Sequence, residues 1–222
     1  MKAELETEKT KWFRQQLAVW AAGNLRDFPW RRTTDPYSIF VAEFLLQKTV
    51  AATASPIYEV FLMRYPTLED LASASVQEVA KLLQPLGLSF RAERLCRSAK
   101  IVAEKNGGIV PASEGELLAL PGVGKYTARS ILANAYEQAA AVLDTNVARI
   151  IERFFGIQGE RVKSRCKILW AAADAIAPEK EVSKWNLTLL DFGALVCTAR
   201  KPRCEVCPLS EECCYFASAK LG

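Results

Sequence analysis

The chain has 222 residues, half of them hydrophobic and 24% charged, and it contains no histidine. Such a length can bury a large core in one domain or in two smaller ones. The absence of histidine excludes a Ser-His-Asp triad, a histidine-ligated zinc and an imidazole general base, so carboxylates, tyrosine, lysine and cysteine remain for any catalysis. The net charge of +4 at pH 7 is basic, but it is too small to imply a polyanionic partner by itself.

No stretch of the sequence predicts a membrane helix or a secretion signal. The longest run without a charged residue extends from Gln15 to Leu25, whereas a membrane-spanning helix needs about 20 apolar residues. Residues 1–6 alternate charged and apolar side chains and lack the apolar core of a signal peptide. We therefore expect a cytoplasmic protein, associated with the nucleoid if it binds DNA, and no membrane partner.

Helical periodicity dominates the chain, and alternating strand patterns are essentially missing. Three Ser/Thr-x-x-Asp/Glu sequences resemble capping boxes and mark helix starts: Thr67 to Asp70, Ser75 to Glu78 and Ser113 to Glu116. With proline and glycine breaks between the periodic segments, the sequence predicts about ten short helices. The fold class that we expect is all-α.

The segment before residue 50 offers two interpretations for several residues. The aromatic, basic sequence Phe28-Pro29-Trp30-Arg31 could form a surface platform or a buried corner, and burial is favoured because Phe and Trp usually pack inside. Glu43 interrupts an otherwise apolar helix, so its carboxylate either faces solvent or stands in a cleft.

A basic stripe is predicted farther along. Arginine or lysine recurs at every third position of one expected helix, at Arg91, Arg94, Arg97 and Lys100. Such a stripe is usually a solvated helix face, and it could instead follow a phosphate backbone.

A helix-hairpin-helix motif is predicted where an apolar run stops at Leu120. Pro121-Gly122-Val123-Gly124 then makes a tight turn, and Lys125 to Tyr136 has a second helical pattern. The N–H groups at the start of that helix lack internal partners and carry the positive end of the helix dipole, which suits a phosphate. The alternative is a hairpin that only joins two packed helices.

Asp144 follows an apolar run and precedes another expected helix. Aspartate is a favoured N-cap, and a cap needs no catalytic role. The two roles are compatible, because a carboxylate held at a helix start is fixed in place and its ionised form is favoured. An anion of this kind can stabilise the oxocarbenium character that develops when an N-glycosidic bond breaks.

Four of the seven cysteines form the pattern C-x6-C-x2-C-x5-C near the C-terminus: Cys197, Cys204, Cys207 and Cys213. An odd number of cysteines without a secretion signal favours thiols or metal ligands over disulfides. The spacing alone suits zinc and a [4Fe-4S] cluster about equally.

Taken together, the sequence LPGVGKYTA over residues 120–128, Asp144 and the cysteine pattern resemble the iron–sulfur branch of the helix-hairpin-helix DNA glycosylases. That superfamily includes endonuclease III and the adenine mismatch glycosylase, and the similarity extends from Phe28 to Cys213. Tyr126 makes the chain most similar to the mismatch-specific thymine-DNA glycosylases. The resemblance implies base excision repair: flipping of thymine, or uracil, mispaired with guanine in double-stranded DNA, followed by hydrolysis of the N-glycosidic bond, by a monomeric enzyme.

The resemblance also implies an architecture and a cofactor. It predicts two helical lobes, a six-helix barrel domain with the hairpin over residues 29–140 and a discontinuous iron–sulfur domain from residues 1–28 and 141–222. The four cysteines of the pattern would hold a [4Fe-4S] cluster, and Cys214 would be left out.

Roles for single residues follow from the same resemblance. Asp144 matches the essential aspartate, and Glu43 matches a glutamate that acts on the base in the adenine enzyme. Tyr126 stands where enzymes with AP lyase activity carry a lysine that forms a Schiff base, so the chain should be monofunctional. The DNA-binding residues that we expect are Gln47, Lys48, Leu88, Gly122, Val123, Gly124, Lys125, Lys201 and Arg203, with Gln47 and Leu88 entering the base stack.

Two other functions remain open at this point. An adenine-DNA glycosylase acting on adenine opposite guanine or oxidised guanine is supported by Glu43 and by the helix end Gln47-Lys48-Thr49. A non-catalytic DNA-binding module would keep the hairpin and the cluster but would need neither Tyr126 nor Asp144.

Overall fold

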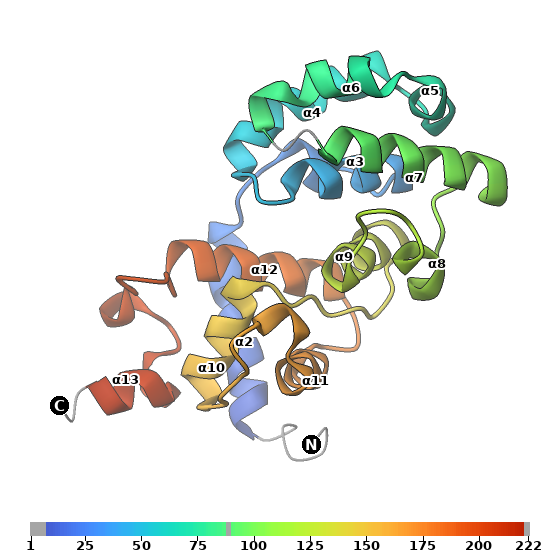
Figure 1. Ribbon diagram of the computed structural model, residues 1–222. Helices are drawn as coiled ribbons and strands as arrows, with labels where there is room; N and C mark the ends of the chain where they lie inside the picture. Colours follow the sequence, from blue (N-terminus) through green and yellow to red (C-terminus); the bar gives the residue numbers. More distant parts are fainter. Residues whose placement is uncertain (1–7, 88–89, 220–222) are drawn as a thin grey trace. The chain divides into compact units, whose positions relative to one another are not determined.

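The computed structural model describes residues 8–87 and 90–219. Over these ranges the chain forms α-helices and short 3-10 helices, without any β-strand (Figure 1). The predicted all-α class is therefore confirmed. None of the helices in the described ranges has the length and apolarity required to cross a bilayer. Leu88, predicted to enter the base stack, lies outside the described residues.

The chain divides into two compact units. Unit 1 combines Met1–Arg26 with Ala139–Gly222, and unit 2 is the continuous segment Asp27–Gln138. The helices of unit 2 are α3 (Pro36–Leu46), α4 (Ala51–Arg64), α5 (Leu68–Ser73), α6 (Val76–Leu83), α7 (Phe90–Asn106), α8 (Glu114–Leu118) and α9 (Lys125–Tyr136). Those of unit 1 are α2 (Glu8–Asn24), α10 (Thr145–Phe155), α11 (Lys167–Ile176), α12 (Val182–Leu195) and α13 (Cys214–Ala219).

In unit 2, α3 and α7 are central. Helix α3 packs against α4, α7 and α9, and α7 packs against α5 and α6 as well (Figure 1). Helix α3 is apolar on nearly every side, as a helix enclosed by neighbours must be; Phe40 and Phe44, for example, are fully buried with ring centroids 4.9 Å apart. This arrangement places the end of α3 and the turn before α9 against the same helix, α7.

Local sequence signals start several of these helices. The capping boxes at Thr67 and Ser75 are both present, with side chain and backbone bonded reciprocally. The third prediction is wrong: Ser113 is the N-cap residue of α8, but its side chain makes no capping hydrogen bond. Helix α8 has only five residues and is held by its packing against α9, so it does not depend on a cap.

The Phe28–Arg31 corner takes a form between the two interpretations. Phe28 and Trp30 are half-buried and stacked, with ring centroids 5.0 Å apart, and the edge of Trp30 meets Tyr58. The guanidinium of Arg31 lies 5.3 Å from the centre of the Phe28 ring. The rings therefore support one another while one side of the stack stays open to solvent.

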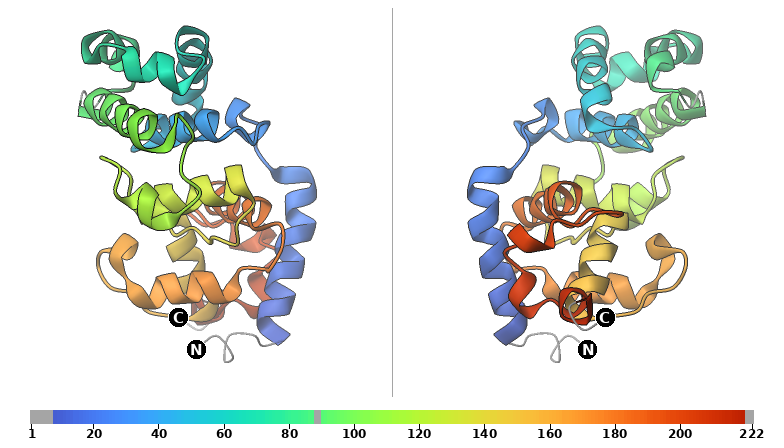
Figure 2. Two further views of the ribbon diagram at one scale, coloured as in Figure 1. Left: turned by 90° about the vertical axis from the view of Figure 1, so that its right-hand side faces the viewer. Right: turned by 90° about the vertical axis from the view of Figure 1, so that its left-hand side faces the viewer.

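In unit 1, the N-terminal helix supplies part of the core formed by the C-terminal half of the chain. Figure 2 shows α2 as one uninterrupted helix, drawn in dark blue. Its Phe13 is fully buried, 4.6 Å from the ring of Phe154 in α10 and 5.8 Å from that of Trp185 in α12. Burying one such side chain contributes about 1.5–3 kcal/mol, so α2 stabilises a core whose other residues lie more than a hundred positions later.

The predicted basic stripe is wrong for one of its members. Arg94, Arg97 and Lys100 are exposed on α7, but Arg91 is buried with 1% of its surface accessible. A helix turns about 100° per residue, so each step of three falls about 60° short of a full turn. Three such steps bring Arg91 and Lys100 to opposite faces of the helix.

Candidate DNA-binding and catalytic sites

The hairpin turn between α8 and α9 is anchored through its carbonyl groups. Ser98 Oγ donates to Pro121 O at 2.9 Å, and Gln47 Nε2 donates to Gly122 O at 3.0 Å. Gly122 has φ +86°, and a side chain there would meet Arg94 Cδ at 3.0 Å, so glycine is required twice over. With its carbonyls turned into the protein, the turn presents the N-terminal end of α9, the end that attracts anions.

The predicted DNA-binding residues of the hairpin differ in exposure. Gly124 is the N-cap of α9, and both Gly124 and Lys125 are exposed. Val123 is buried, and its N–H donates to Leu120 O at 3.1 Å. Val123 therefore supports the turn from inside, whereas Gly124 and Lys125 are accessible to a ligand.

The loop after α3 carries the next two predicted residues. Gln47 ends the helix, and its side-chain amide is bound to the hairpin carbonyl described above. Lys48 is exposed and has φ +53°, a left-handed conformation that a lysine rarely adopts. Entry of Gln47 into a base stack stays a prediction, and it would require release of the bond to Gly122.

Asp144 is the N-cap of α10. Its Oδ1 accepts hydrogen bonds from the backbone N–H groups of Asn146 and Val147, both at 2.8 Å, and its Oδ2 accepts one from Asn146 Nδ2 at 2.8 Å. The capping role is thus confirmed. Desolvation raises the pKa of Asp144 above its ordinary value, and these hydrogen bonds oppose the rise because they favour the ionised carboxylate.

Asn146 is itself held in place by Arg149. The Nη2 group of Arg149 donates to Asn146 Oδ1 at 2.7 Å and to Gly193 O at 2.8 Å, and Nε donates to Cys197 O at 2.7 Å. The Asn146 amide, assigned from this network, therefore turns its NH2 group toward Asp144. A Cβ on Gly193 would lie 2.5 Å from Asn146 Cβ, which leaves room only for glycine. Neither Asn146 nor Arg149 was among the residues predicted from the sequence.

Glu43 lies inside unit 2. Its carboxylate is 8% exposed and accepts a hydrogen bond from Ser130 Oγ of α9 at 2.7 Å. Ser130 in turn accepts from Asn134 Nδ2 at 3.1 Å. Desolvation raises the pKa of Glu43 to about 7. Of the two interpretations, exposure to solvent is excluded.

Tyr126 is half-buried in the first turn of α9. It precedes Ser130 by four residues, so both lie on the same side of the helix. Because Ser130 binds Glu43, the side of α9 that bears Tyr126 is the side that meets α3. The sequence analysis did not name Ser130, although its spacing from Tyr126 was a usable signal.

The four cysteines of the C-terminal pattern are half-buried, whereas Cys214 is exposed. Burial raises the pKa of Cys207 to about 11, and the neighbouring sulfurs Cys197, Cys213 and Cys204 add to the rise. The four thiols are thus near enough to interact, yet among the described residues no group of three or more cysteine or acidic side chains has metal-binding geometry. Metal binding is coupled to deprotonation of the ligands and to folding of the segment that carries them. Four thiols in one segment therefore suit a metal centre that brings them together as it binds.

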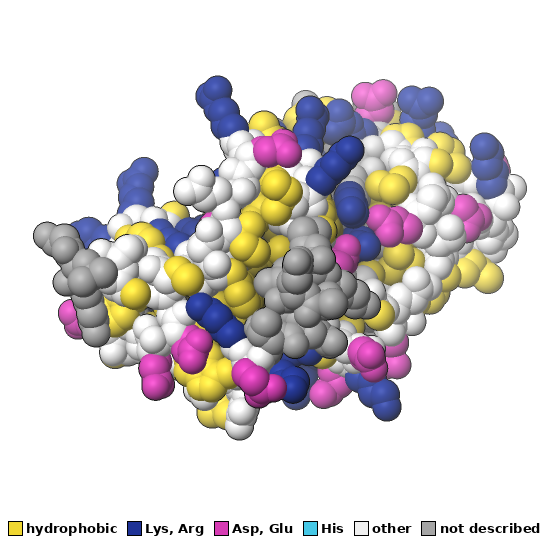
Figure 3. Space-filling view, turned by 90° about the horizontal axis from the view of Figure 1, so that it is seen from below, with side chains coloured by type: hydrophobic (Ala, Val, Ile, Leu, Met, Phe, Trp, Pro, Cys, Tyr) yellow, Lys and Arg dark blue, Asp and Glu magenta, His cyan; other side chains and the backbone are white. Residues whose placement is uncertain are grey.

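Basic residues surround this segment. Arg153 Nη1 lies 3.5 Å from Cys197 Sγ and also donates to Thr198 O at 2.7 Å. Lys201 and Arg203, both predicted to contact DNA, are exposed within the six-residue gap of the pattern. On the face drawn in Figure 3, Lys and Arg side chains are interspersed with Asp and Glu, so charge alone does not mark a DNA-binding surface there.

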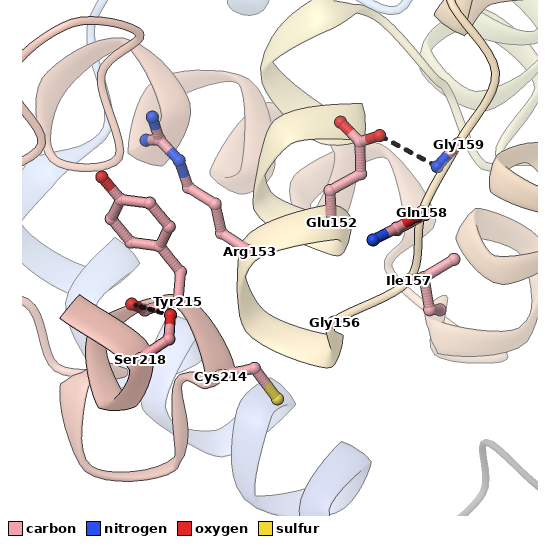
Figure 4. Close-up of a pocket in the computed structure, with 9 residues that line it drawn as sticks. All are labelled: Glu152, Arg153, Gly156, Ile157, Gln158, Gly159, Cys214, Tyr215 and Ser218. Atoms are coloured by element: carbon pink, nitrogen blue, oxygen red, sulfur yellow. Dashed lines mark hydrogen bonds between the residues drawn. The ribbon is translucent and has the colours of Figure 1, made fainter. Parts of the chain in front are cut away.

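An open pocket of about 450 Å³ lies beside the cysteine segment in unit 1 (Figure 4). It is lined by Glu152, Arg153, Gly156, Ile157, Gln158, Gly159, Cys214, Tyr215 and Ser218. Its charged side chains bind the protein itself: Glu152 accepts from Gly159 N at 3.0 Å, and Arg153 donates to Ala199 O at 3.0 Å. Asp144 does not line this pocket, so it is separate from the predicted chemistry.

Comparisons with known proteins match both the segment with the hairpin and Asp144 and the cysteine segment. Residues 41–173, which contain the hairpin and Asp144, match the HhH-GPD superfamily base excision DNA repair protein family. The chain is also 39% identical over 210 residues to a thymine/uracil-DNA glycosylase of Methanothermobacter thermautotrophicus, covering 94% of this chain and 95% of the relative. The chain belongs to the HhH-GPD superfamily of base excision DNA repair proteins. The predicted family is confirmed, as is the enzyme class: this HhH-GPD chain is a DNA glycosylase, and it acts on DNA.

The cofactor of this HhH-GPD chain is confirmed by a second family match. Residues 197–213 match the iron–sulfur binding domain of endonuclease III, a family that binds a [4Fe-4S] cluster. The match decides between zinc and the cluster, which the spacing left open.

Two further comparisons concern relatives of this HhH-GPD chain. It superimposes on a thermostable thymine-DNA glycosylase with a TM-score of 0.91 and 38% identity, covering 96% of this chain and 99% of the other. It is 34% identical over 196 residues to an adenine DNA glycosylase of Buchnera aphidicola subsp. Baizongia pistaciae, covering 88% of this chain but 56% of the relative.

Proposed function

We propose that this glycosylase releases thymine, and uracil, mispaired with guanine in double-stranded DNA, by hydrolysis of the N-glycosidic bond after base flipping. The observation that carries the proposal is the similarity along almost the whole chain to a thymine/uracil-DNA glycosylase. A G·T wobble pair is already weakened, so its extrusion costs less than that of a normal pair. A site that accepts the methyl group of thymine also admits the smaller uracil.

Asp144 is the anion that faces the developing positive charge on the sugar or that orients the attacking water. Three hydrogen bonds fix its carboxylate at the start of α10, so it needs no rearrangement as charge develops. Glu43, with a pKa of about 7, can hold or release a proton at neutral pH and suits a group that acts on the base.

Tyr126 supports a monofunctional reaction that leaves an abasic site. A phenol cannot form the Schiff base through which a lysine would carry out strand cleavage. Borohydride trapping of the enzyme on DNA tests this point: the parent should give no crosslink, and Tyr126→Lys should gain one. Comparable trapping by the parent would point to another amine, with Lys125 and Lys48 the first to replace.

DNA contacts are proposed for two sets of residues. In unit 2 these are Gln47, Lys48 and Leu88 together with Gly122, Val123, Gly124 and Lys125, with Val123 acting only through the backbone of the turn. In unit 1 they are Lys201 and Arg203, which the cysteine segment presents to phosphate. Replacing Lys201 or Arg203 with a neutral residue should make DNA affinity less dependent on salt concentration, because each phosphate contact releases counterions.

Cys197, Cys204, Cys207 and Cys213 are the proposed cluster ligands. Cys214 is supported as the omitted thiol because it lines the separate pocket and Lys9 Nζ donates to its sulfur at 3.6 Å. When bound, the cluster would join the end of α12 to the C-terminal segment, because Cys197 follows α12 and the other three thiols lie in residues 204–213. Cys204→Ser should lose iron and sulfide, whereas Cys214→Ser should keep both; the opposite result would reassign the fourth ligand.

The two units support a division into the two predicted domains, 29–140 and 1–28 with 141–222, since the boundaries found from residue contacts fall at 26/27 and 138/139. We also propose that the enzyme works as a monomer in the cytoplasm, on nucleoid DNA. Sedimentation of the enzyme bound to one duplex tests the monomer, and an enzyme-to-duplex ratio of two would exclude it.

The deciding experiment is a panel of duplexes, each with a single mismatch or lesion, assayed with one preparation under single-turnover conditions. We expect release of thymine from G·T and of uracil from G·U, and little action on A·T. An adenine glycosylase is the second candidate, favoured by the buried Glu43 and by the adenine relative. Release of adenine without thymine would establish that alternative, and binding without any release would leave a DNA-binding module.

A further inference from the structure

Arg91 is a charged side chain enclosed in the core of unit 2. Only 1% of its surface is accessible, and no carboxylate among the described residues forms an ion pair with it. Removing a guanidinium from water is costly unless its donors are satisfied. The two Nη groups of Arg91 have acceptors, whereas Nε is buried without a hydrogen-bond partner. A buried arginine without a counter-ion therefore calls for a structural reason, which the acceptors of the Nη groups supply.

The hydrogen bonds of Arg91 all go to the end of α3 and the loop that follows. Nη1 donates to Leu45 O at 2.9 Å, and Nη2 donates to Gln47 O at 2.7 Å and to Thr49 Oγ1 at 3.0 Å. The last carbonyl groups of a helix carry the negative end of its dipole and lack intrahelical partners. The end of α3 thus takes the place of the missing carboxylate.

Lys48 lies between two residues that Arg91 binds. Its left-handed conformation, φ +53°, costs about 1–2 kcal/mol for a residue with a side chain, so the surrounding contacts must hold it. Arg91 fixes Gln47 on one side and Thr49 on the other. The Gln47 side chain then extends the connection to the hairpin by donating to Gly122 O. One chain of hydrogen bonds therefore joins α7, the loop 47–49 and the hairpin turn.

We propose that Arg91 is a positioning residue that holds the loop 47–49 in its working conformation in the DNA-free enzyme. Loss of Arg91 should therefore impair base extrusion more than it impairs DNA binding. The proposal rests on the proposed function for its choice of mismatched DNA. A preset loop enters the duplex without first being ordered, and misplacement of such an element by about 1 Å can cost about 100-fold in rate.

The first test needs no DNA. Hydrogen exchange is measured at the amides of Gln47 and Thr49, which donate to Phe44 O and Leu46 O. Arg91→Met should speed their exchange roughly tenfold or more, because the clamp that holds the loop is lost. Arg97→Met is the matched control, since it removes an exposed arginine from the same helix; exchange in the loop should not change.

The second test uses a G·T duplex with 2-aminopurine beside the mismatch, whose fluorescence reports unstacking. Arg91→Met should lower the unstacking signal, and it should lower the single-turnover rate by about 100-fold. The dissociation constant of the variant for the duplex should change by less than about threefold. Arg91→Lys, which keeps the charge but not the fork of donors, should fall between the two. Lys105→Met removes an exposed cation of the same helix that lies outside the basic stripe, and it should leave both the unstacking signal and the single-turnover rate unchanged.

Thr49→Val provides a milder version if Arg91→Met does not fold. It removes the Thr49 Oγ1 acceptor of Arg91 together with the hydrogen bond that this hydroxyl donates to Gln47 O at 3.3 Å, and it leaves both carbonyl acceptors of Arg91 in place. It should raise loop exchange and lower unstacking by a smaller factor than Arg91→Met. Unchanged loop exchange in folded Arg91→Met or Thr49→Val would overturn the proposal, as would a loss confined to affinity. If the parent enzyme releases no thymine, the proposed function fails, while loop exchange still decides the role of Arg91.

Discussion

Two carboxylates, one in each unit, differ in burial and in how they are held: Glu43 is buried and Asp144 is half-buried. Asp144 stands at the N-terminus of α10 and accepts three hydrogen bonds from the backbone and side chain of that helix. Glu43 stands in the middle of α3 and accepts one hydrogen bond, from Ser130. Desolvation raises the pKa of both groups. For Asp144 the helix terminus opposes this rise, whereas for Glu43 a single hydroxyl leaves the pKa at about 7.

The comparison shows that burial alone does not decide the charge of a carboxylate. The N–H donors at a helix start stabilise the ionised form and oppose the effect of burial, so Asp144 suits a group that acts as an anion. A carboxyl group with one weak donor exchanges its proton near neutral pH, so Glu43 suits proton transfer. The chain contains no histidine, and the pKa of Glu43 lies in the range in which a histidine usually titrates.

The largest effect is expected from Asp144→Asn. Asparagine is also a good N-cap, so α10 should stay folded and DNA binding should be retained while the anion is lost. We expect the single-turnover rate to fall by about 1,000-fold. Base release and DNA affinity should be measured on the same variant. A rate equal to that of the parent would reduce Asp144 to a structural cap.

Glu43→Gln comes next, with a rate about 100-fold below that of the parent at pH 6. In the parent, Glu43 is protonated below its pKa of about 7, so a role as acid predicts activity that declines as pH rises through 7. In the variant this alkaline decline should disappear. If the variant keeps both the parent's rate and its pH profile, Glu43 takes no part in the reaction.

Asn146→Ala should have a smaller effect, about tenfold on the acidic limb of the pH–rate profile. Losing the Nδ2 donor removes a hydrogen bond that favours ionised Asp144, so the pKa of Asp144 rises further and the acidic limb of the pH–rate profile moves to higher pH. The deficit should shrink as the pH is raised, because a higher pH restores the ionised form of Asp144. Thr145→Ala, an exposed neighbour, is the control. A deficit independent of pH would indicate misplacement alone.

Ser130→Ala should cause the smallest change, less than about threefold at pH 7. The Ser130 hydrogen bond lowers the pKa of Glu43 against the larger effect of burial. Without it, the pKa should rise, and the alkaline limb should move to higher pH. A shift toward lower pH would contradict the assignment of that limb to Glu43.

Features encoded by neighbouring residues were predicted well from the sequence. The hairpin turn and the cap at Asp144 each depend on a few consecutive residues whose backbone preferences are strong. Two of the three capping boxes also formed, at Thr67 and Ser75. The Ser113 side chain makes no capping hydrogen bond, although Ser113 is the N-cap residue of α8.

Features that depend on contacts between distant segments were missed or left open. Arg91 looks like its exposed neighbours on α7, and only the position of α3 and its loop shows that it is buried. Glu43 could not be placed, because its partner Ser130 comes 87 positions later. Arg149 was overlooked for the same reason, since its acceptors Gly193 and Cys197 lie on another helix and in the cysteine segment.

The assembly of unit 1 from both ends of the chain has a consequence for synthesis on the ribosome. Unit 2 is continuous and can fold as soon as residue 138 has emerged. Helix α2 emerges first, but Phe13 and Leu17 find their partners only once α10 and α12 have been made. At about 5–20 residues per second, synthesis through the end of α12 takes roughly ten to a few tens of seconds, during which the apolar side of α2 has no partner from that core. Helix α2, the first helix of the described residues, is therefore among the last of them to be packed, and a nascent chain arrested before residue 139 should expose it to chaperones.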